Sequence, residues 1–245
     1  MQNKLFHNLK RGEPVQVDEL EAIADELVDS IFENRDALFC LARIREKDSY
    51  LMEHSLNVGM LLANFGRFLE LERPVLRELT IGGLLHDTGK IMIPDHILHK
   101  PGRLTEDEFI IMKSHVNHSI SILNESKGIT PIMMTVAACH HERLDGKGYP
   151  RRLTADALQT TDRIMAIADI FEALTAADRP YKPAKTLSES LRIMVGMCRD
   201  GHIDGELFGH FLQSGLWRDY AQRFMLAGQQ DTVDVDALLT HLRQP

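Results

Sequence analysis

The chain has 245 residues, of which 44% are hydrophobic, and a formal charge of −8 at pH 7. This length allows one sizeable core with a small appended subdomain, and no run approaches the roughly 18 apolar residues that span a bilayer. The acidic balance, with an isoelectric point near 5.8, argues against a nucleic-acid-binding surface, because polyanion binders usually show a basic stripe. An anionic substrate would therefore need local positive charge, such as bound metal.

Helical periodicity extends over nearly the whole chain, and no alternating pattern is long enough for a strand. Residues 17 to about 44 repeat apolar positions every three to four residues, which predicts one long amphipathic helix. Three roles stay open for it: packing on the chain's own core, pairing in a dimer, and relaying a signal from a preceding domain. Further helices are expected at 49–70, 74–85, 105–124, 130–141, 160–177, 187–197 and 205–217.

Gly and Pro mark the predicted loops at 91–104 and 144–153, and 178–185 is a third interruption. Thr105 and Glu108 form a capping-box pattern that predicts a helix start. Trp217, Tyr220 and Phe224 follow helical spacing, which predicts a small helical extension covering apolar surface. The expected architecture is all-α, divided into an N-terminal helical segment (1–47), a main domain (48–197) and a C-terminal helical extension (198–245).

Two unusual residue pairs carry the chemistry: His86-Asp87 in LLHDTGK, and His140-His141 in CHHERLDGKGYP. Imidazole nitrogen and carboxylate oxygen together bind first-row transition metals, and a carboxylate beside a ligating histidine can bridge two ions. Adjacent imidazoles on a helix diverge by about 100°, so His140 and His141 suit neighbouring positions of a dinuclear site. These pairs indicate a metal-dependent phosphohydrolase.

Three more ionisable residues fall on apolar helical faces, where a bare charge would be costly to bury. His54 lies on the apolar stripe of its predicted helix, and Asp169 is in the middle of another. His115 follows Ile111 by four residues, which predicts that it faces inward, while His118, one turn on, competes for the same role. We favour His115. The ordered set of His, His-Asp, His, His-His and Asp predicts a metal centre.

Together these motifs resemble the HD-GYP family, a branch of the HD-domain phosphohydrolases, over about residues 48–197. HDTGK matches the family's HD signature, HHERLDGKGYP its His-His pair and Gly-Tyr-Pro element, and ADIFEALTAADRPYK the segment with the last ligand. The resemblance implies an HD-domain helical bundle that hydrolyses cyclic di-GMP to linear pGpG, and often onward to GMP. It also implies a centre of two or three iron or manganese ions, with Asp87 as the bridge. The implied ligands are His54, His86, Asp87, His115, His140, His141 and Asp169.

The chain departs from the trinuclear version of the family at Tyr50, where that version has an added glutamate. A phenol is a poor substitute ligand, so we expect two divalent ions and slow cleavage of pGpG to GMP. Many relatives carry Asp where this chain has Glu172. The expected reaction is in-line attack of a metal-bridging hydroxide on the phosphodiester.

By the same resemblance, three basic residues are expected to face substrate phosphates: Lys90, Arg179 and Lys182. Lys90 and Asp87 are also expected to act in catalysis. The guanidinium of Arg179 suits bidentate phosphate contact. The loop Gly148-Tyr149-Pro150 is expected to contact a partner, which could be a diguanylate cyclase (GGDEF) domain. Asp145-Gly146 and Gly148 also suit an ordinary tight turn.

Two other functions stay open: an HD hydrolase for another nucleotide such as cyclic GMP-AMP, because no residue visibly reads guanine, and a receptor or scaffold without turnover. Neither a nucleic-acid nor a membrane partner is expected. Three cysteines scattered through apolar runs, Cys40, Cys139 and Cys198, predict buried thiols in a reducing bacterial cytoplasm rather than disulfides. The charged, helix-forming start of the chain suggests a piece of a longer regulatory protein.

Overall fold

The computed structural model describes residues 14–15, 17–33, 50–176 and 185–243, apart from some side chains at helix ends. Within these ranges the chain is helical and has no strand, and an isolated bridge joins Asp145 and Thr154. The predicted all-α class is therefore confirmed. The chain divides into two compact units, an N-terminal unit of residues 1–138 and a C-terminal unit of residues 139–245. No helix in the described ranges has the length and apolar character needed to cross a membrane.

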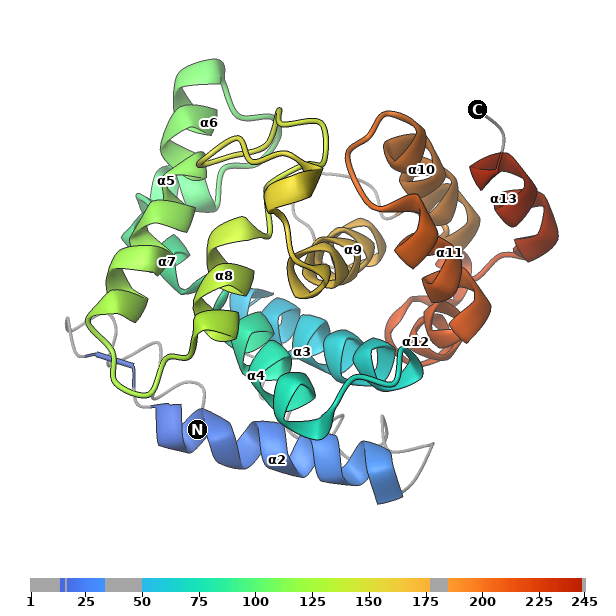
Figure 1. Ribbon diagram of the computed structural model, residues 1–245. Helices are drawn as coiled ribbons and strands as arrows, with labels where there is room; N and C mark the ends of the chain where they lie inside the picture. Colours follow the sequence, from blue (N-terminus) through green and yellow to red (C-terminus); the bar gives the residue numbers. More distant parts are fainter. Residues whose placement is uncertain (1–13, 16, 34–49, 177–184, 244–245) are drawn as a thin grey trace. The chain divides into compact units, whose positions relative to one another are not determined.

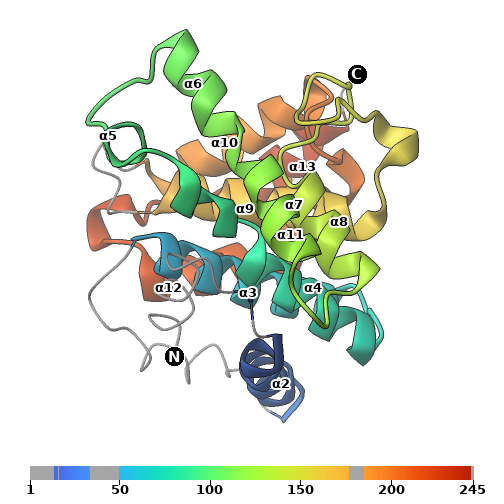
Figure 2. The ribbon, with the colours of Figure 1, turned by 90° about the vertical axis from the view of Figure 1, so that its left-hand side faces the viewer.

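Three long helices are followed by shorter ones in the N-terminal unit. They are α2 (Val17–Glu33), α3 (Tyr50–Phe68), α4 (Arg73–Leu85), η3 (Thr88–Met92), α5 (Asp95–Leu98), α6 (Glu106–Lys113), α7 (His115–Asn124) and α8 (Pro131–Cys139), whose last residue opens the C-terminal unit. Helices α3 and α4 pack side by side, and α2 lies along both of them (Figures 1 and 2). Gly83 permits this close approach, because an added Cβ would lie 2.3 Å from Leu62 and 3.5 Å from the Cα of Gly59.

Helix α2 packs on the core of its own unit, which decides the role left open for its apolar face. Leu20 and Ala24 are buried, and they join Ile81 and Leu85 of α4 in one hydrophobic cluster. On its polar side, Arg77 of α4 binds Asp25 at 2.5 Å. Surface ion pairs of this kind contribute little to the free energy of folding. Burial of apolar side chains therefore holds α2 in place. Residues 34–44 of the predicted helix lie outside the described residues.

The C-terminal unit contains η4 (Ala155–Ala157), α9 (Thr160–Thr175), α10 (Leu187–Arg199), α11 (Gly205–Ser214), α12 (Leu216–Phe224), η5 (Ala227–Gln229) and α13 (Val235–Leu242). Phe171 of α9 lies at its centre, 5.1 Å from the ring of Phe211 and 5.4 Å from that of Tyr220. Trp217 is buried and donates a hydrogen bond to the Leu212 carbonyl at 2.9 Å. The extension therefore covers apolar surface of α9, as predicted.

Several predicted helix boundaries are wrong. The helix expected at 105–124 is two helices that meet at Ser114, although its capping box between Thr105 and Glu108 is confirmed. The helix expected at 205–217 ends at Ser214, because Gly215 adopts the left-handed conformation (φ 73°) and starts α12 in a new direction. The helix expected at 130–141 ends at Cys139, and the predicted loop 91–104 contains α5.

Candidate metal centre

His86 and Asp87 follow directly after the last residue of α4, and both side chains are fully buried. The His86 ring is held by its Nδ1, which donates to the Gly83 carbonyl at 2.7 Å. Ser119 of α7 fastens the backbone beneath it, donating from Oγ to the His86 carbonyl at 2.8 Å. This arrangement leaves Nε2 of His86 as the ligand atom, 3.2 Å from Oδ2 of Asp87.

His54 reaches the same place from α3, because α3 and α4 pack side by side. Its Nε2 lies 3.2 Å from Nε2 of His86 and 3.5 Å from Oδ2 of Asp87. The three residues each place one ligand atom within 4.8 Å of the others. The packing of two helices thus brings together residues that are 32 positions apart in the sequence.

His115 completes the cluster, although not for the reason its sequence spacing suggested. Ile111, the residue thought to mark the inward face, is 40% exposed, and His115 is 1% exposed because it begins a separate helix, α7. Its Nδ1 donates to the Met112 carbonyl at 2.7 Å, and its Nε2 lies 3.3 Å from Oδ1 of Asp87. The competing His118 is only partly buried. Gly89 allows this packing, since an added Cβ would lie 2.0 Å from the His115 carbonyl oxygen.

The protonation of these groups is compatible with a cation between them. Burial, opposed by the charge of Asp87, lowers the pKa of His115 to about 4, so the ring is neutral at pH 7. Because its Nδ1 carries the proton given to Met112, its Nε2 presents a lone pair to Asp87. Burial raises the pKa of Asp87, but His86 and Lys90 outweigh it and hold that pKa well below its usual range. A lone pair therefore faces a carboxylate.

The distances fit shared coordination. Two ligands, each about 2.1 Å from one ion at angles of roughly 90–109°, are about 3.0–3.4 Å apart. The separations from Asp87 to His86 and His115, 3.2 and 3.3 Å, agree with that range. The donor set of buried imidazole nitrogens and carboxylate oxygens thus fits a divalent transition metal.

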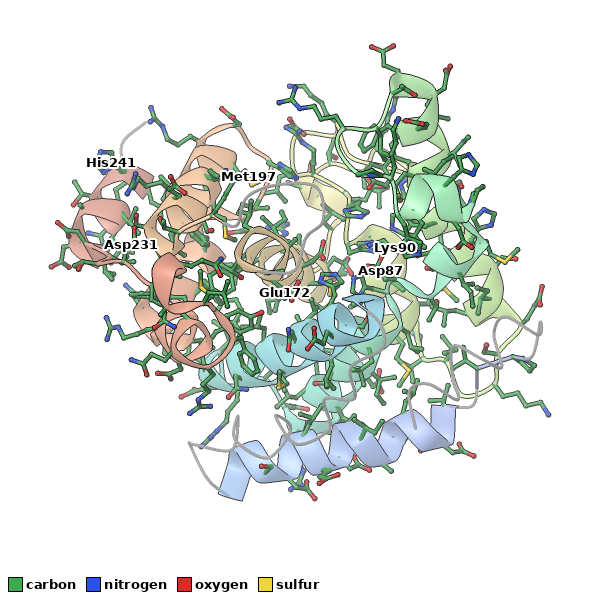
Figure 3. The ribbon with its side chains drawn as sticks, turned by 180° about the vertical axis from the view of Figure 1, so that it is seen from behind. Asp87, Lys90, Glu172, Met197, Asp231 and His241 are labelled. Carbon is green, nitrogen blue, oxygen red and sulfur yellow. The ribbon has the colours of Figure 1, made fainter. Side chains whose placement is uncertain are left out.

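Lys90 lies beside this cluster, on η3 (Figure 3). Its Nζ donates to Oδ2 of Asp87 at 2.5 Å, and its side chain is 19% exposed. The ammonium therefore contacts the carboxylate predicted to bridge the metals. The contact places the positive charge of a partly exposed side chain against the buried Asp87.

A second cluster lies in the C-terminal unit. His140 and His141 come directly after α8, with ring centroids 4.1 Å apart, and His140 is buried. Asp169, in the middle of α9, is 6% exposed, and its Oδ2 lies 4.0 Å from Nδ1 of His141. Because the two histidines follow the helix rather than ending it, a turn and not helical geometry sets the angle between them. The cluster offers two imidazoles and one carboxylate.

The Gly-Tyr-Pro loop folds back onto this cluster. Tyr149 donates its backbone N–H to the His141 carbonyl at 3.1 Å, and the two rings lie 4.7 Å apart. Glu142, a residue that the sequence reasoning passed over, is buried and accepts backbone N–H bonds from Arg151 at 2.6 Å and Leu153 at 2.9 Å. Its position directly after the His-His pair was the one feature of the sequence that could have indicated a role at this site. Glu142 thus joins the loop to the ligand segment.

We expect Gly148→Ala to destabilise this loop by about 1–3 kcal/mol, the usual cost of overpacking. An added Cβ would lie 2.5 Å from backbone atoms of Glu142 and Arg143, which cannot move aside as a side chain can. Urea unfolding of the full chain would measure the change. Gly228→Ala is the matched control, because its Cβ would meet nothing within 4 Å. Equal stability of the two variants would contradict the close packing of Gly148.

Glu172 and Tyr220 link α9 to the C-terminal extension. Glu172, one turn after Asp169, is 2% exposed, and the Tyr220 hydroxyl donates to its Oε1 at 3.3 Å. Two predicted phosphate-binding residues, Arg179 and Lys182, lie outside the described residues, and so does the side chain of Tyr50. Cys139 is buried, and burial raises its pKa to about 12, which fits the predicted inert thiol.

Comparison with known proteins gives one family and several relatives. A family model described as "HD domain" matches residues 33–207. Cyclic di-GMP phosphodiesterase PA4108 of Pseudomonas aeruginosa is 34% identical over 210 residues, which is 86% of this chain and 50% of that protein. 3'3'-cGAMP-specific phosphodiesterase 1 of Vibrio cholerae is 39% identical over 162 residues, which is 66% of this chain and 37% of that protein. The chain thus spans half or less of the length of these relatives.

One solved structure shares the fold. Bd1817, an HDG"Y"P protein from Bdellovibrio bacteriovorus, superimposes with a TM-score of 0.66 at 18% sequence identity. The match covers 90% of this chain and 67% of that one. The helical arrangement is therefore that of a known protein, whereas identity this low says nothing about chemistry.

Proposed function

Because the chain belongs to the HD domain family, in the HD-GYP branch that its motifs predicted, we propose that it is a metal-dependent phosphodiesterase hydrolysing cyclic di-GMP to linear pGpG. One observation supports the metal dependence: buried histidine nitrogens lie 3.2 and 3.3 Å from the carboxylate of Asp87, a donor set and spacing that fit a divalent cation. The name of the Pseudomonas relative supports the substrate.

The proposed centre holds two divalent ions, iron or manganese, bound by both clusters. Each cluster alone offers three or four ligands, too few to fill the coordination of two ions. The sequence order of the seven ligands matches the HD-GYP motifs, which supports assigning them to one centre. Tyr50 in place of an added glutamate argues against a third ion.

The bound ions would supply a nucleophile at neutral pH and neutralise charge on the phosphodiester. The protein's own residues would orient the ligands and bind the substrate. Hydrogen bonds to the backbone carbonyls of Gly83 and Met112 keep His86 and His115 in the tautomer that presents Nε2. Three basic residues are proposed to bind the phosphate oxygens of the substrate: Lys90, Arg179 and Lys182. Of these, Lys90 also contacts Asp87.

A second substrate has a specific observation in its favour. The Vibrio relative, 39% identical, is named as specific for 3'3'-cGAMP. Both molecules are cyclic dinucleotides with the same charged backbone, so the metal centre would serve either. Base contacts would then decide between them.

The test of the proposal is a substrate panel with metal analysis. The full chain, reconstituted with Fe(II) or Mn(II), is incubated with cyclic di-GMP, cyclic GMP-AMP and cyclic di-AMP while metal per chain is measured. We expect about two ions per chain and fastest turnover of cyclic di-GMP. Faster hydrolysis of cyclic GMP-AMP would move the assignment to the second substrate. Tight binding of cyclic di-GMP without hydrolysis would identify a receptor instead.

The product of the reaction is expected to be pGpG that accumulates, with slow conversion to GMP. The linear intermediate carries more negative charge than the cyclic substrate. A two-metal centre without the additional carboxylate lacks a ligand for a third ion, which would offset that charge. A chromatographic time course would measure both products. GMP that appears without a lag, at a rate matching substrate loss, would contradict this expectation.

The other predictions from sequence stay predictions. They are a diguanylate cyclase partner at Gly148, Tyr149 and Pro150, a homodimer, a cytoplasmic location, and the division of the chain at residues 47 and 197. Pull-down with a GGDEF domain, with Tyr149→Ala as the comparison, would test the first of them.

A further inference from the structure

One buried hydroxyl, that of Ser119, fastens the turn between α4 and η3 to α7. Its Oγ donates to the His86 carbonyl at 2.8 Å and accepts from the Gly89 backbone N–H at 2.8 Å. Ser119 is 0% exposed. Asp87 lies in the sequence between the two bonded residues, beside Lys90 (Figure 3). The backbone is therefore anchored on both sides of the carboxylate that is predicted to bridge the metals.

Two other buried hydroxyls on helices of this chain bond within their own helix. Thr80 donates to the Leu76 carbonyl at 2.7 Å, and Thr175 donates to the Phe171 carbonyl at 2.8 Å, in each case four residues earlier. Such local bonds are the usual pattern for serine and threonine inside a helix. The Ser119 hydroxyl instead bonds to residues 30 and 33 positions away. It therefore joins two segments rather than supporting its own helix.

The two backbone groups that Ser119 binds lie where helical hydrogen bonds end. The His86 carbonyl follows the last residue of α4, and the Gly89 N–H belongs to the first turn of η3. A buried backbone group that loses its partner carries the full cost of having left water. Without the hydroxyl, we therefore expect the turn to shift until these groups find other partners.

Ser119 also lies on the helix that supplies His115. Helix α7 begins at His115, and Ser119 follows it by four residues, about one turn. The separation of 3.3 Å between Nε2 of His115 and Oδ1 of Asp87 thus depends on how the turn is held against α7. Because metal ligands must keep nearly fixed distances and angles, a shift of the turn would weaken the binding of an ion.

We propose that Ser119 is a positioning residue of the metal centre, which sets the affinity for the ion bound by His86, Asp87 and His115. The inference rests on the metal centre of the proposed function. Ser119 acts through the backbone of the ligand segment and does not bind the ion itself. Residues that orient metal ligands in this way contribute about 10- to 100-fold to metal affinity.

The test compares Ser119→Ala with Ser190→Ala in the full chain. Ser190 is the matched control, because it is also 0% exposed and its hydroxyl donates to the Thr186 carbonyl at 2.9 Å, at the start of α10. Metal-free protein is titrated with Mn(II) by calorimetry, without substrate. We expect Ser119→Ala to weaken Mn(II) binding about 10- to 100-fold, and Ser190→Ala to bind Mn(II) within about twofold of the wild type.

Two further measurements separate positioning from a loss of folding. Circular dichroism should show that both variants stay helical at the temperature of the titration. The visible absorption bands of bound Co(II) depend on the geometry of its ligands, so they should change in Ser119→Ala and match the wild type in Ser190→Ala.

The outcomes distinguish this proposal from the proposed function. Unchanged Mn(II) affinity in Ser119→Ala, or an equal loss in Ser190→Ala, would overturn the role of Ser119 and leave the metal centre in place. A wild-type chain that binds no Mn(II) would overturn the metal centre and the role of Ser119 together.

Discussion

Replacing Asp87 with asparagine is expected to lower phosphodiesterase activity by about 10³-fold or more, since a bridging ligand supports several kcal/mol of transition-state stabilisation. Asparagine keeps the size of the buried side chain but loses the charge that faces His86, His115 and Lys90. Metal per chain should fall below two in the same variant. Activity with cyclic di-GMP and metal content would be measured on protein whose circular dichroism remains helical.

Lys90→Ala is the comparison for this prediction. Lys90 contacts Asp87 but is 19% exposed, and its removal leaves the ligand set intact. We expect a smaller loss, about 10- to 100-fold, typical of one charge-assisted hydrogen bond, with metal content unchanged. Near-normal turnover of Asp87→Asn, or a larger loss in Lys90→Ala, would show that Asp87 is not the bridge.

The second large effect is expected for Asp169→Asn, which tests whether the C-terminal cluster serves the same centre. Asp169 is buried beside His141, and losing a metal ligand should lower activity more than about 100-fold, beyond the 10- to 100-fold typical of residues that only support ligands. Metal content should fall below two per chain. Metal analysis and turnover on the same preparation would measure both.

Glu172→Gln is the matched control, one turn further along α9. Glutamine still accepts the hydrogen bond from the Tyr220 hydroxyl and conserves volume. We expect two ions per chain and activity within about tenfold of wild type. Two retained ions and normal turnover in Asp169→Asn would remove the C-terminal cluster from the centre.

Local patterns predicted where helices occur better than where they end. The capping box at Thr105 was readable because both of its residues lie within one turn. The break at Ser114 was not, since the sequence on both sides continues a helical pattern and packing of α7 against η3 decides its direction. Gly215 is visible in the sequence, but its left-handed conformation is a property of the folded chain.

His115 is buried, as predicted, although the argument for its inward position was wrong. The spacing from Ile111 suggested an inward face, yet Ile111 is 40% exposed and His115 is buried through a new helix. The expectation held because burying histidine without function is costly, whatever the periodicity. The two backbone partners of Glu142, in contrast, could not be predicted from a local pattern, because they follow it by nine and eleven residues.

The sequence by itself determined the fold class and the family, and it predicted the ligand residues, because helical periodicity and metal chemistry depend on residue types at short spacing. Only the tertiary structure decided how His54, His86 and His115 meet at Asp87. Their separations of 3.2–3.5 Å result from the packing of α3, α4 and α7. Contacts between residues far apart in the sequence depend on the packing of the whole core, which no local pattern encodes.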